Sequence, residues 1–249
     1  MRIPLVCLGI LALLVAPPAS AQDEGEYLYN VRMVRAAPGQ WLELMDLIEA
    51  ADALHREAGD VPPFRMRHSQ GDQWDFMLIH PMGDHSTWYA PERVARRARV
   101  WESGEGRDLA ARLEAATAWT EEWFARSVPL DELQRRFEGM GFYHIEMFAG
   151  LPGRRAELVE QRRKENRFFA RLDRQLNLIF VRDSGPNWDA MTIGFYESLQ
   201  AYAAATAASA ARDRDSAARA AGFEGVDAIS PLLRSLLSYH HDTLAVSVR

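Results

Sequence analysis

The feature that most constrains how this chain can fold is an internal repeat. The segment YNVRMVRAAPGQWLEL at residues 29–44 returns as YHIEMFAGLPGRRAEL at residues 143–158. The two copies are 143 − 29 = 114 residues apart, and this offset holds without a gap over 79 − 29 + 1 = 51 positions. The first members of the identical pairs are Tyr29, Met33, Pro38, Gly39, Glu43, Leu44, Gly71, Trp74, Asp75, Met77 and Ile79. The repeat predicts two copies of one structural unit.

Each copy begins with a predicted strand and helix. Residues 29–34 alternate in polarity, which is typical of a strand. Pro38 or Pro152 is then expected to open a helix, since proline is tolerated in the first helical turn. Leu44, Leu47 and Ile48 share one face of the first helix. Of their counterparts only Leu158 is apolar, so the second helix must bury a different face.

The remainder of each copy predicts a hairpin, a second helix and a last strand. Strands are expected at 64–70 and 74–80, and again at 178–184 and 188–194. Asp84 and Ser198 are suitable N-caps for the helix that follows. The sequence DTLAVSVR at 242–249 predicts a final strand. Its counterpart ARSVPLDEL at 125–133 is a poor strand, and we expect it to be missing or irregular.

This β-α-β-β-α-β order is the ferredoxin-like plan, an α+β fold in which helices cover one face of a sheet. The predicted boundaries are 22–137 for the first unit and 138–249 for the second. Each sheet has an uncovered face that needs a partner. We therefore predict that the two tandem units pack their sheets face to face as a single-chain dimeric α/β barrel.

Three motifs carry a family resemblance. The opening pattern Y-x-[VI]-x-M-x(4)-PG-x(3)-EL, with W-D-x-M-x-I and FYESLQAY further along, resembles NIPSNAP and EthD-like proteins. The resemblance covers roughly residues 27–90 and 141–203. These proteins belong to the dimeric α/β-barrel group, which includes the antibiotic-biosynthesis monooxygenases. The resemblance implies the barrel fold, but the group holds cofactor-free oxygenases, isomerases and haem proteins, so it does not imply one activity.

The two faces of the first strand suggest different roles. Tyr29, Val31 and Met33 recur almost unchanged in the second copy, so their face is predicted to pack under the helices. The opposite face is polar and differs between the copies, so we expect it to line the barrel lumen. The predicted ligand-binding residues are Asn30, Arg32, Trp74, Phe76, His80, Phe148 and Trp188.

Several of these residues allow a structural or a chemical role. Glu146 either pairs with Arg32 in the interior or acts as a general base, and Arg32 could instead anchor an anion. His144 either hydrogen-bonds in the core or transfers protons, so His144 and Glu146 are the catalytic candidates. Trp74 and Trp188 are core residues or pocket walls. Asp75 and Asp189 are predicted to cap the hairpin turns.

Composition argues against several classes of function. Acidic residues outnumber basic ones by 35 to 29, and the arginines alternate with acids, so no nucleic-acid partner is expected. The histidines never fall at a recognised metal-ligand spacing, and no metal is predicted. The resemblance implies that a haem would need a histidine on a helix of the second unit. Residues 154–172 contain none, so we expect no cofactor.

The N-terminal segment predicts export. Arg2 precedes an apolar run, and Ala19-Ser20-Ala21 forms a small-residue cleavage site, so residues 1–21 are predicted to be a signal peptide. Cys7, the only cysteine, lies within it, which leaves no disulfide or thiol chemistry. We expect a periplasmic or secreted protein with no integral membrane segment after cleavage. A homodimer is left open.

These observations favour an exported protein that binds a small, partly apolar organic molecule in the barrel lumen. One alternative is a cofactor-independent enzyme of the monooxygenase or isomerase kind, with proton transfer by His144 and Glu146. Another is a scaffold whose barrel interior is only a core. The sequence does not decide whether the protein is an enzyme.

Overall fold

The computed structural model describes residues 25, 27–185, 187–210 and 213–248, and the predicted signal peptide lies outside them. The first half contains β1 (Tyr27–Ala36), α1 (Trp41–Glu57), β2 (Phe64–Gln70), β3 (Phe76–Gly83), α2 (His85–Trp88), α3 (Pro91–Trp101), α4 (Gly104–Ala116) and β4 (Thr117–Ser127). The linking helix is α5 (Leu130–Phe137). The second half contains β5 (Phe142–Gly150), α6 (Arg155–Arg171), β6 (Leu178–Ser184), β7 (Ala190–Tyr196), α7 (Leu199–Ala210), α8 (Arg214–Ala220), the 3-10 helix η1 (Val226–Ala228), α9 (Ile229–Arg234) and β8 (Leu237–Ser247).

The strands form one closed antiparallel barrel in the order β1-β3-β2-β8-β5-β7-β6-β4. Around this ring, the neighbouring strands β4, β1, β3 and β2 come from the first half of the chain, and β8, β5, β7 and β6 come from the second. Each half therefore supplies one four-stranded ferredoxin-like sheet. The sheets join where β4 pairs with β6 and where β2 pairs with β8. The predicted single-chain dimeric α/β barrel is confirmed.

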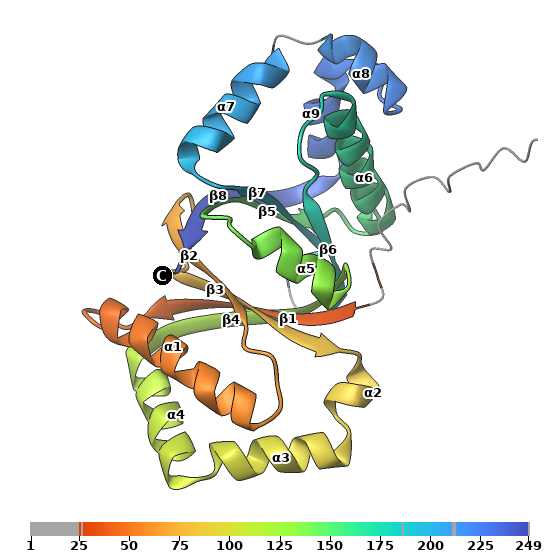
Figure 1. Ribbon diagram of the computed structural model, residues 1–249. Coiled ribbons are helices and arrows are strands. Elements are labelled where there is room, and N and C mark those ends of the chain that lie inside the picture. The colour runs from red at the N-terminus through yellow and green to blue at the C-terminus, as the bar shows by residue number, and fades with distance from the viewer. Residues whose placement is uncertain (1–24, 26, 186, 211–212, 249) are drawn as a thin grey trace, which may run out of the picture.

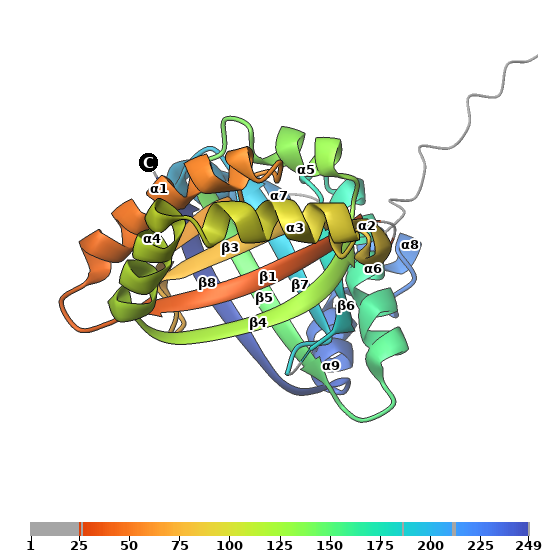
Figure 2. The ribbon, with the colours of Figure 1, turned by 90° about the horizontal axis from the view of Figure 1, so that it is seen from below.

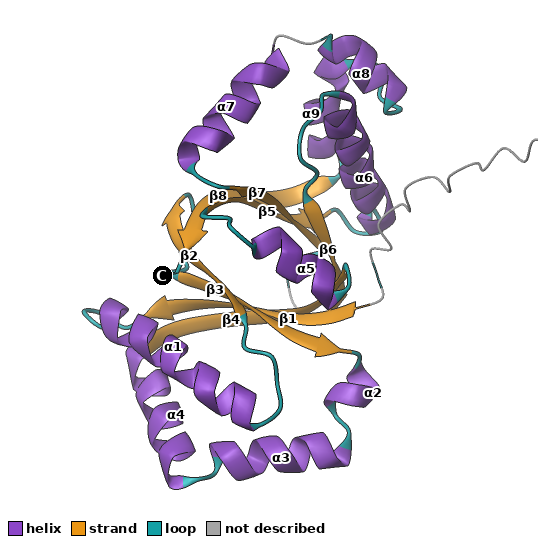
Figure 3. Cartoon of the chain, viewed as in Figure 1, coloured by secondary structure: helices purple, strands orange, loops and turns teal. Residues whose placement is uncertain are grey.

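Helices cover the barrel on two opposite sides. Figure 1 shows α1, α3 and α4 on one side of the strands, and α6 to α9 on the other. Figure 3 shows the same layers, with strands in the middle and helices outside. Seen from below, α1 and α3 lie over β1 and β3 (Figure 2). The linker helix α5 lies between the two groups, and its Leu133 packs into the barrel core.

Two aspartates make the same contact in both halves. The Asp75 carboxylate accepts a hydrogen bond from the backbone N–H of Ala36 at 2.8 Å, and Asp189 accepts from Gly150 at 2.8 Å. Both pairs obey the repeat offset, because 150 − 36 and 189 − 75 equal 114. Each carboxylate therefore fixes the end of the first strand of its unit against the start of the third. We predicted that these carboxylates cap the hairpin turns. They bind instead the backbone N–H groups at the ends of β1 and β5.

The barrel lumen is a filled core, which corrects the predicted strand faces. Tyr29, Val31 and Met33 point into the barrel, where they meet Tyr143, Ile145 and Met147 of the other unit. All six side chains are at most 2% exposed. The polar face of each first strand points away from the lumen, toward the helices of its own unit. The physical reason is that the lumen is shared by both units, so its residues are alike, whereas each outer face contacts its own helix.

Two local predictions need correction. The last strand of the first unit is not missing: β4 runs from Thr117 to Ser127 and ends within the segment that was expected to be weak. Its pairing with β6 is irregular where that segment begins, since the register shifts between Phe124 and Ala125. The Pro-Gly pairs form turns before the helices instead of opening them, since α1 begins at Trp41 and Gly39 has a φ of 78°. Such a positive φ favours glycine over residues with a Cβ.

The predicted helix caps are confirmed. Asp84 accepts a hydrogen bond from the backbone N–H of Thr87 at 2.8 Å and caps α2. Ser198 Oγ accepts from the backbone N–H of Ala201 at 3.2 Å at the start of α7. Within the described residues, no helix has the length and apolar character needed to cross a membrane.

Candidate functional site

The barrel disperses the residues predicted to line one lumen site. Trp74 and Trp188 belong to the barrel core, where their indole N–H groups donate to Asp72 and Glu121 at 3.0 and 2.7 Å. Phe76 lies under α1 and stacks on Trp41, with ring centroids 5.3 Å apart. The other predicted residues fall into two groups, one under the helices of each unit. Asn30, Arg32 and His80 belong to the first unit, and His144, Glu146 and Phe148 to the second.

Arg32 and His80 of the first group border a cavity of about 620 Å³ between the sheet and the helices. Its floor is formed by Val34 and Leu78 of β1 and β3, and α1 contributes Leu44, Ile48 and Ala51. The walls include Trp101 at the end of α3 and Trp119 of β4. The cavity combines these apolar side chains with polar ones, among them Arg32, His80 and Glu114. Its size is in the range of small-molecule sites. This cavity lies outside the barrel wall and not in the lumen.

A smaller lobe of about 230 Å³ adjoins this cavity. It is lined by Asn30, Trp88, Tyr89 and Phe124, among others. The residues that border both the main cavity and the smaller lobe are Arg32, His55, His80 and Trp101. These four residues mark the junction between the two spaces.

Burial favours the neutral form of both histidines at the junction. Burial lowers the pKa of His80 to about 3, and the neighbouring His55 and Arg32 lower it further. Burial likewise lowers the pKa of His55. The rings lie 5.6 Å apart, and neither is hydrogen-bonded to another residue of the described chain. Neutral imidazoles can donate or accept hydrogen bonds, but a group with a pKa near 3 is a poor proton acceptor at neutral pH.

Arg32 supplies the positive charge at the junction. It lies opposite Glu122 in the β1–β4 ladder, and its Nε is 4.0 Å from Glu122 Oε2. Within the described part of the chain the guanidinium makes no hydrogen bond. The predicted pairing of Arg32 with Glu146 is wrong, because the two lie on the outer faces of different units. An exposed pair at this distance contributes little, so the Arg32 guanidinium is available to a ligand.

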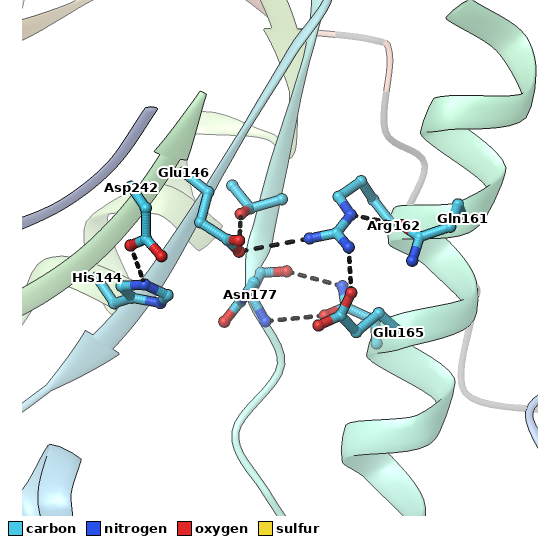
Figure 4. A network of polar contacts seen from close by, with 9 residues as sticks. His144, Glu146, Gln161, Arg162, Glu165, Asn177 and Asp242 are labelled. Atoms are coloured by element: carbon cyan, nitrogen blue, oxygen red, sulfur yellow. Dashed lines mark hydrogen bonds and ion pairs between the residues drawn. The ribbon is translucent and has the colours of Figure 1, made fainter. Parts of the chain in front are cut away.

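The second unit fills the equivalent space with its own side chains. At the offset of 114 residues, the cavity-lining positions carry Glu146 for Arg32, Phe148 for Val34, Arg162 for Ile48, Glu165 for Ala51, Asn177 for Pro63, Thr192 for Leu78 and Gly194 for His80. Figure 4 shows this polar network between β5 and α6. The longer side chains at the helix positions occupy the volume that Ile48 and Ala51 leave empty.

Arg162 is the centre of this network. Its side chain is 2% exposed and bridges Glu146, at 3.4 Å, and Glu165. The guanidinium also lies over the Phe148 ring, with Cζ 4.7 Å from the centroid. Thr192 Oγ1 donates to the same Glu146 oxygen at 3.2 Å, and burial raises the pKa of Glu165. The Glu146 carboxylate is therefore engaged by the protein, which weakens its predicted role as a general base.

His144 forms a separate pair beside this network. Its Nε2 lies 2.7 Å from Asp242 Oδ1 across the β5–β8 ladder (Figure 4). Burial alone lowers the pKa of His144, but the Asp242 hydrogen bond and the Glu146 charge outweigh it and leave the pKa above its usual value. An imidazole held by a carboxylate can act in proton transfer.

Of the residues that line the cavity, only Arg32 and His80 were predicted as ligand-binding, and three large ring-bearing side chains were missed. His55 lies on α1, Trp101 ends α3 and Trp119 lies on β4. The helix pattern gave a signal for His55, since it follows Ile48 by seven residues and so lies on the same face. The two tryptophans lie outside the repeated segment, and no signal pointed to them. Among the described residues, no cluster of three or more histidine or acidic side chains could hold a metal ion.

The comparisons bear on the fold. No family model matches the sequence, and no curated protein matches it significantly. An anthrone oxidase-like protein is 13% identical with a TM-score of 0.54, over 92% of this chain and 94% of that one. Candidate monooxygenases from Lactobacillus acidophilus and Fusobacterium nucleatum are 7% and 8% identical, each with a TM-score of 0.52 over 90% of this chain and 95% and 94% of theirs. At these identities the likeness shows the dimeric α/β-barrel fold alone.

Proposed function

We propose that this protein binds a small, partly apolar organic molecule in the cavity of its first unit. The observation that carries the proposal is the contrast between the units. One leaves about 620 Å³ between sheet and helices, and the other fills the same place with a buried ion-pair network. If the space between sheet and helices served only as a packed core, we would expect it to be filled in both units.

The binding proposal is tested with N-phenyl-1-naphthylamine, a neutral dye that fluoresces in apolar sites. Ala51 points into the cavity from α1, whereas Ala50 on the same helix is exposed. We expect Ala51→Phe to weaken dye binding at least tenfold and Ala50→Phe to leave it unchanged. The second unit carries the larger Glu165 at the position of Ala51, so the fold tolerates bulk there. Equal dye binding by both variants would refute the cavity as the site.

A second candidate function is a cofactor-independent monooxygenase. Two observations favour it: the His144–Asp242 pair, and the descriptions of the similar structures as monooxygenase or anthrone oxidase-like proteins. The test is oxygen uptake with anthrone as the probe. Loss of uptake in His144→Ala, with Arg32→Gln unaffected, would assign catalysis to the second unit. Loss of uptake in Arg32→Gln, with His144→Ala unaffected, would assign catalysis to the cavity. If the wild type takes up no oxygen, the monooxygenase function is rejected for this substrate and only the binding proposal remains.

We also propose that the chain is an exported relative of the NIPSNAP and EthD-like proteins whose two units arose by duplication. The repeated motif positions and the matching Asp75 and Asp189 hydrogen bonds support the duplication. The N-terminal sequence pattern supports export. Cell fractionation with an intact-mass measurement tests it: the expected product begins at Gln22 outside the cytoplasm, and a full-length cytoplasmic chain would contradict it.

A further inference from the structure

We propose that the ligand of the first unit is an organic anion whose acidic group binds Arg32, with its apolar body in the main cavity. This inference rests on the proposed binding function and adds the chemical class of the ligand. It follows from the way the two units distribute charge at equivalent positions.

The second unit displays a complete version of the interaction. There the strand provides a carboxylate, Glu146, and the helix provides the guanidinium of Arg162, which also covers an aromatic ring. In the first unit the charge on the strand is reversed, since Arg32 stands at the Glu146 position. The helix position that would answer it is Ile48, which has no charge. The only acid that Arg32 approaches among the described residues is the exposed Glu122, 4.0 Å from its Nε, and the space on the helix side of Arg32 is left open.

The surroundings of Arg32 favour an anion over other occupants. Of the four residues at the junction of the two lobes, Arg32 alone is charged, because the pKa values of His55 and His80 are lowered. The neutral imidazoles can donate hydrogen bonds to a carboxylate without adding charge. Two acids also line the smaller lobe. Asp60 is held by Arg93 at 2.9 Å and lies 4.0 Å from Arg97, and Glu122 is 54% exposed and 4.0 Å from Arg32, so each acid already faces an arginine.

The exposure of Arg32 suits an acidic headgroup. Its side chain is 45% exposed, so a bound anion would keep part of its hydration and avoid the penalty of full burial. A planar guanidinium can bind a carboxylate or sulfonate through two parallel hydrogen bonds. The apolar floor at Val34 and Leu78 begins beside it and extends under Leu44 of α1. The ligand expected from this layout is amphipathic, with one acidic end and one aromatic or aliphatic end.

A matched pair of dyes tests the class. 8-Anilinonaphthalene-1-sulfonate has the same aromatic skeleton as N-phenyl-1-naphthylamine and carries a negative charge. Titrating both against each variant separates the contribution of the charge from that of the apolar body. We expect Arg32→Gln to weaken binding of the sulfonate roughly 10- to 100-fold, the range for a hydrogen bond to a charged group. The neutral dye is expected to change less than about threefold, which also verifies that the cavity persists.

Two further variants complete the test. Arg32→Lys keeps the charge but not the bidentate geometry, so it is expected to lose only part of the sulfonate affinity. It also serves if Arg32→Gln does not fold. Arg99→Gln removes an exposed arginine of α3 and should leave the affinity for both dyes unchanged. Equal weakening of both dyes, or unchanged sulfonate binding in Arg32→Gln, would overturn the anion class. If Ala51→Phe still excludes the neutral dye in that case, the cavity itself stands.

Discussion

At the scale of single residues, Arg162 shows how a buried charge is tolerated. Its guanidinium is almost completely enclosed, yet two carboxylates, the Gln161 side-chain oxygen and the Phe148 ring surround it. Removing such a cation leaves acidic groups buried without a partner, which is more damaging than never having had the charge. In the first unit the equivalent Ile48 needs no such partners, which is why the cavity can remain open there.

We expect Arg162→Met to lower the free energy of unfolding by about 3–5 kcal/mol, because Glu146 and Glu165 would lose their counter-ion. Urea denaturation measures the change. The control is Arg167→Met on the same helix, since Arg167 forms an exposed pair with Glu160 and should change stability by less than about 1 kcal/mol. Adding Glu146→Gln and Glu165→Gln to Arg162→Met should recover much of the loss. A single variant as stable as the wild type would show that the network is unimportant.

The His144–Asp242 pair predicts a pH-dependent contribution to stability. The pKa of His144 is raised above 6.5, so its contribution is complete below that pH and disappears as the pH rises through the folded-state pKa. The His144 hydrogen bond lowers the pKa of Asp242 below 3.8, so its contribution is lost only as the pH falls below that value. Both are present between about pH 3.8 and 6.5.

His144→Gln should therefore be less stable than the wild type at about pH 5.5, and the difference should narrow by about pH 8.5. Because Asp242 is 56% exposed, the gap is expected to be about 1 kcal/mol or less. Thermal unfolding at several pH values measures it, with Asp242→Asn as the matched partner variant. A gap that stays constant across the range would argue against the pair.

At the scale of elements, the sequence predicted where the strands lie in the chain better than which face of each strand points into the barrel. The strand at 64–70 and its counterpart at 178–184 have the predicted bounds, because alternation and flanking turn residues define them locally. Which face points inward is not local. It depends on whether the helix packed against the strand is apolar or polar.

The helix sequences therefore contain information about strand orientation that the strand pattern alone lacks. The α1 face with Leu44, Leu47 and Ile48 requires apolar partners, and it finds Val34 and Leu78 on the sheet. The equivalent α6 face carries Gln161 and Arg162, which match the polar residues of β5 and β7. Comparing helix and strand faces together would have placed Asn30, Arg32, His144 and Glu146 under the helices. The cavity itself depends on side-chain volumes across four elements, which no local pattern reports.

The repeated aspartates allow a prediction about how β1 and β5 are held. Asp75→Ala removes a charged acceptor from the Ala36 N–H and should lower stability by about 1.5–3 kcal/mol. Asp189→Ala should lower it more, because Asp189 also pairs with Arg182 at 2.6 Å. Urea denaturation compares them with Asp46→Ala, an exposed residue of α1 that should be neutral. If both variants match this control, the contact does not fix the strand ends.

At the scale of the whole molecule, the filled lumen makes the two units depend on each other. The barrel core combines Tyr29, Val31 and Met33 with Tyr143, Ile145 and Met147, so neither sheet buries its inner face alone. The seams add polar contacts between the units. Asp183 of β6 pairs with Arg126 of β4 at 2.8 Å and with His85 of α2 at 2.9 Å. The units are structural halves of one core and not independent domains.

Separating the halves tests this dependence. A fragment of residues 25–137 would expose the apolar inner face of its sheet together with the edges of β2 and β4, which are unpaired without β8 and β6. We expect it to aggregate or to form a homodimer, in which a second copy replaces the missing unit. Co-expression with residues 138–249 should restore a soluble one-to-one complex, because the correct inner face and seams are again available. Size-exclusion chromatography with light scattering distinguishes these states. A monomeric first fragment that unfolds cooperatively would show that the shared lumen is not what stabilises the unit. The explanation for the apolar pattern that recurs in both units would then have to lie within a single sheet.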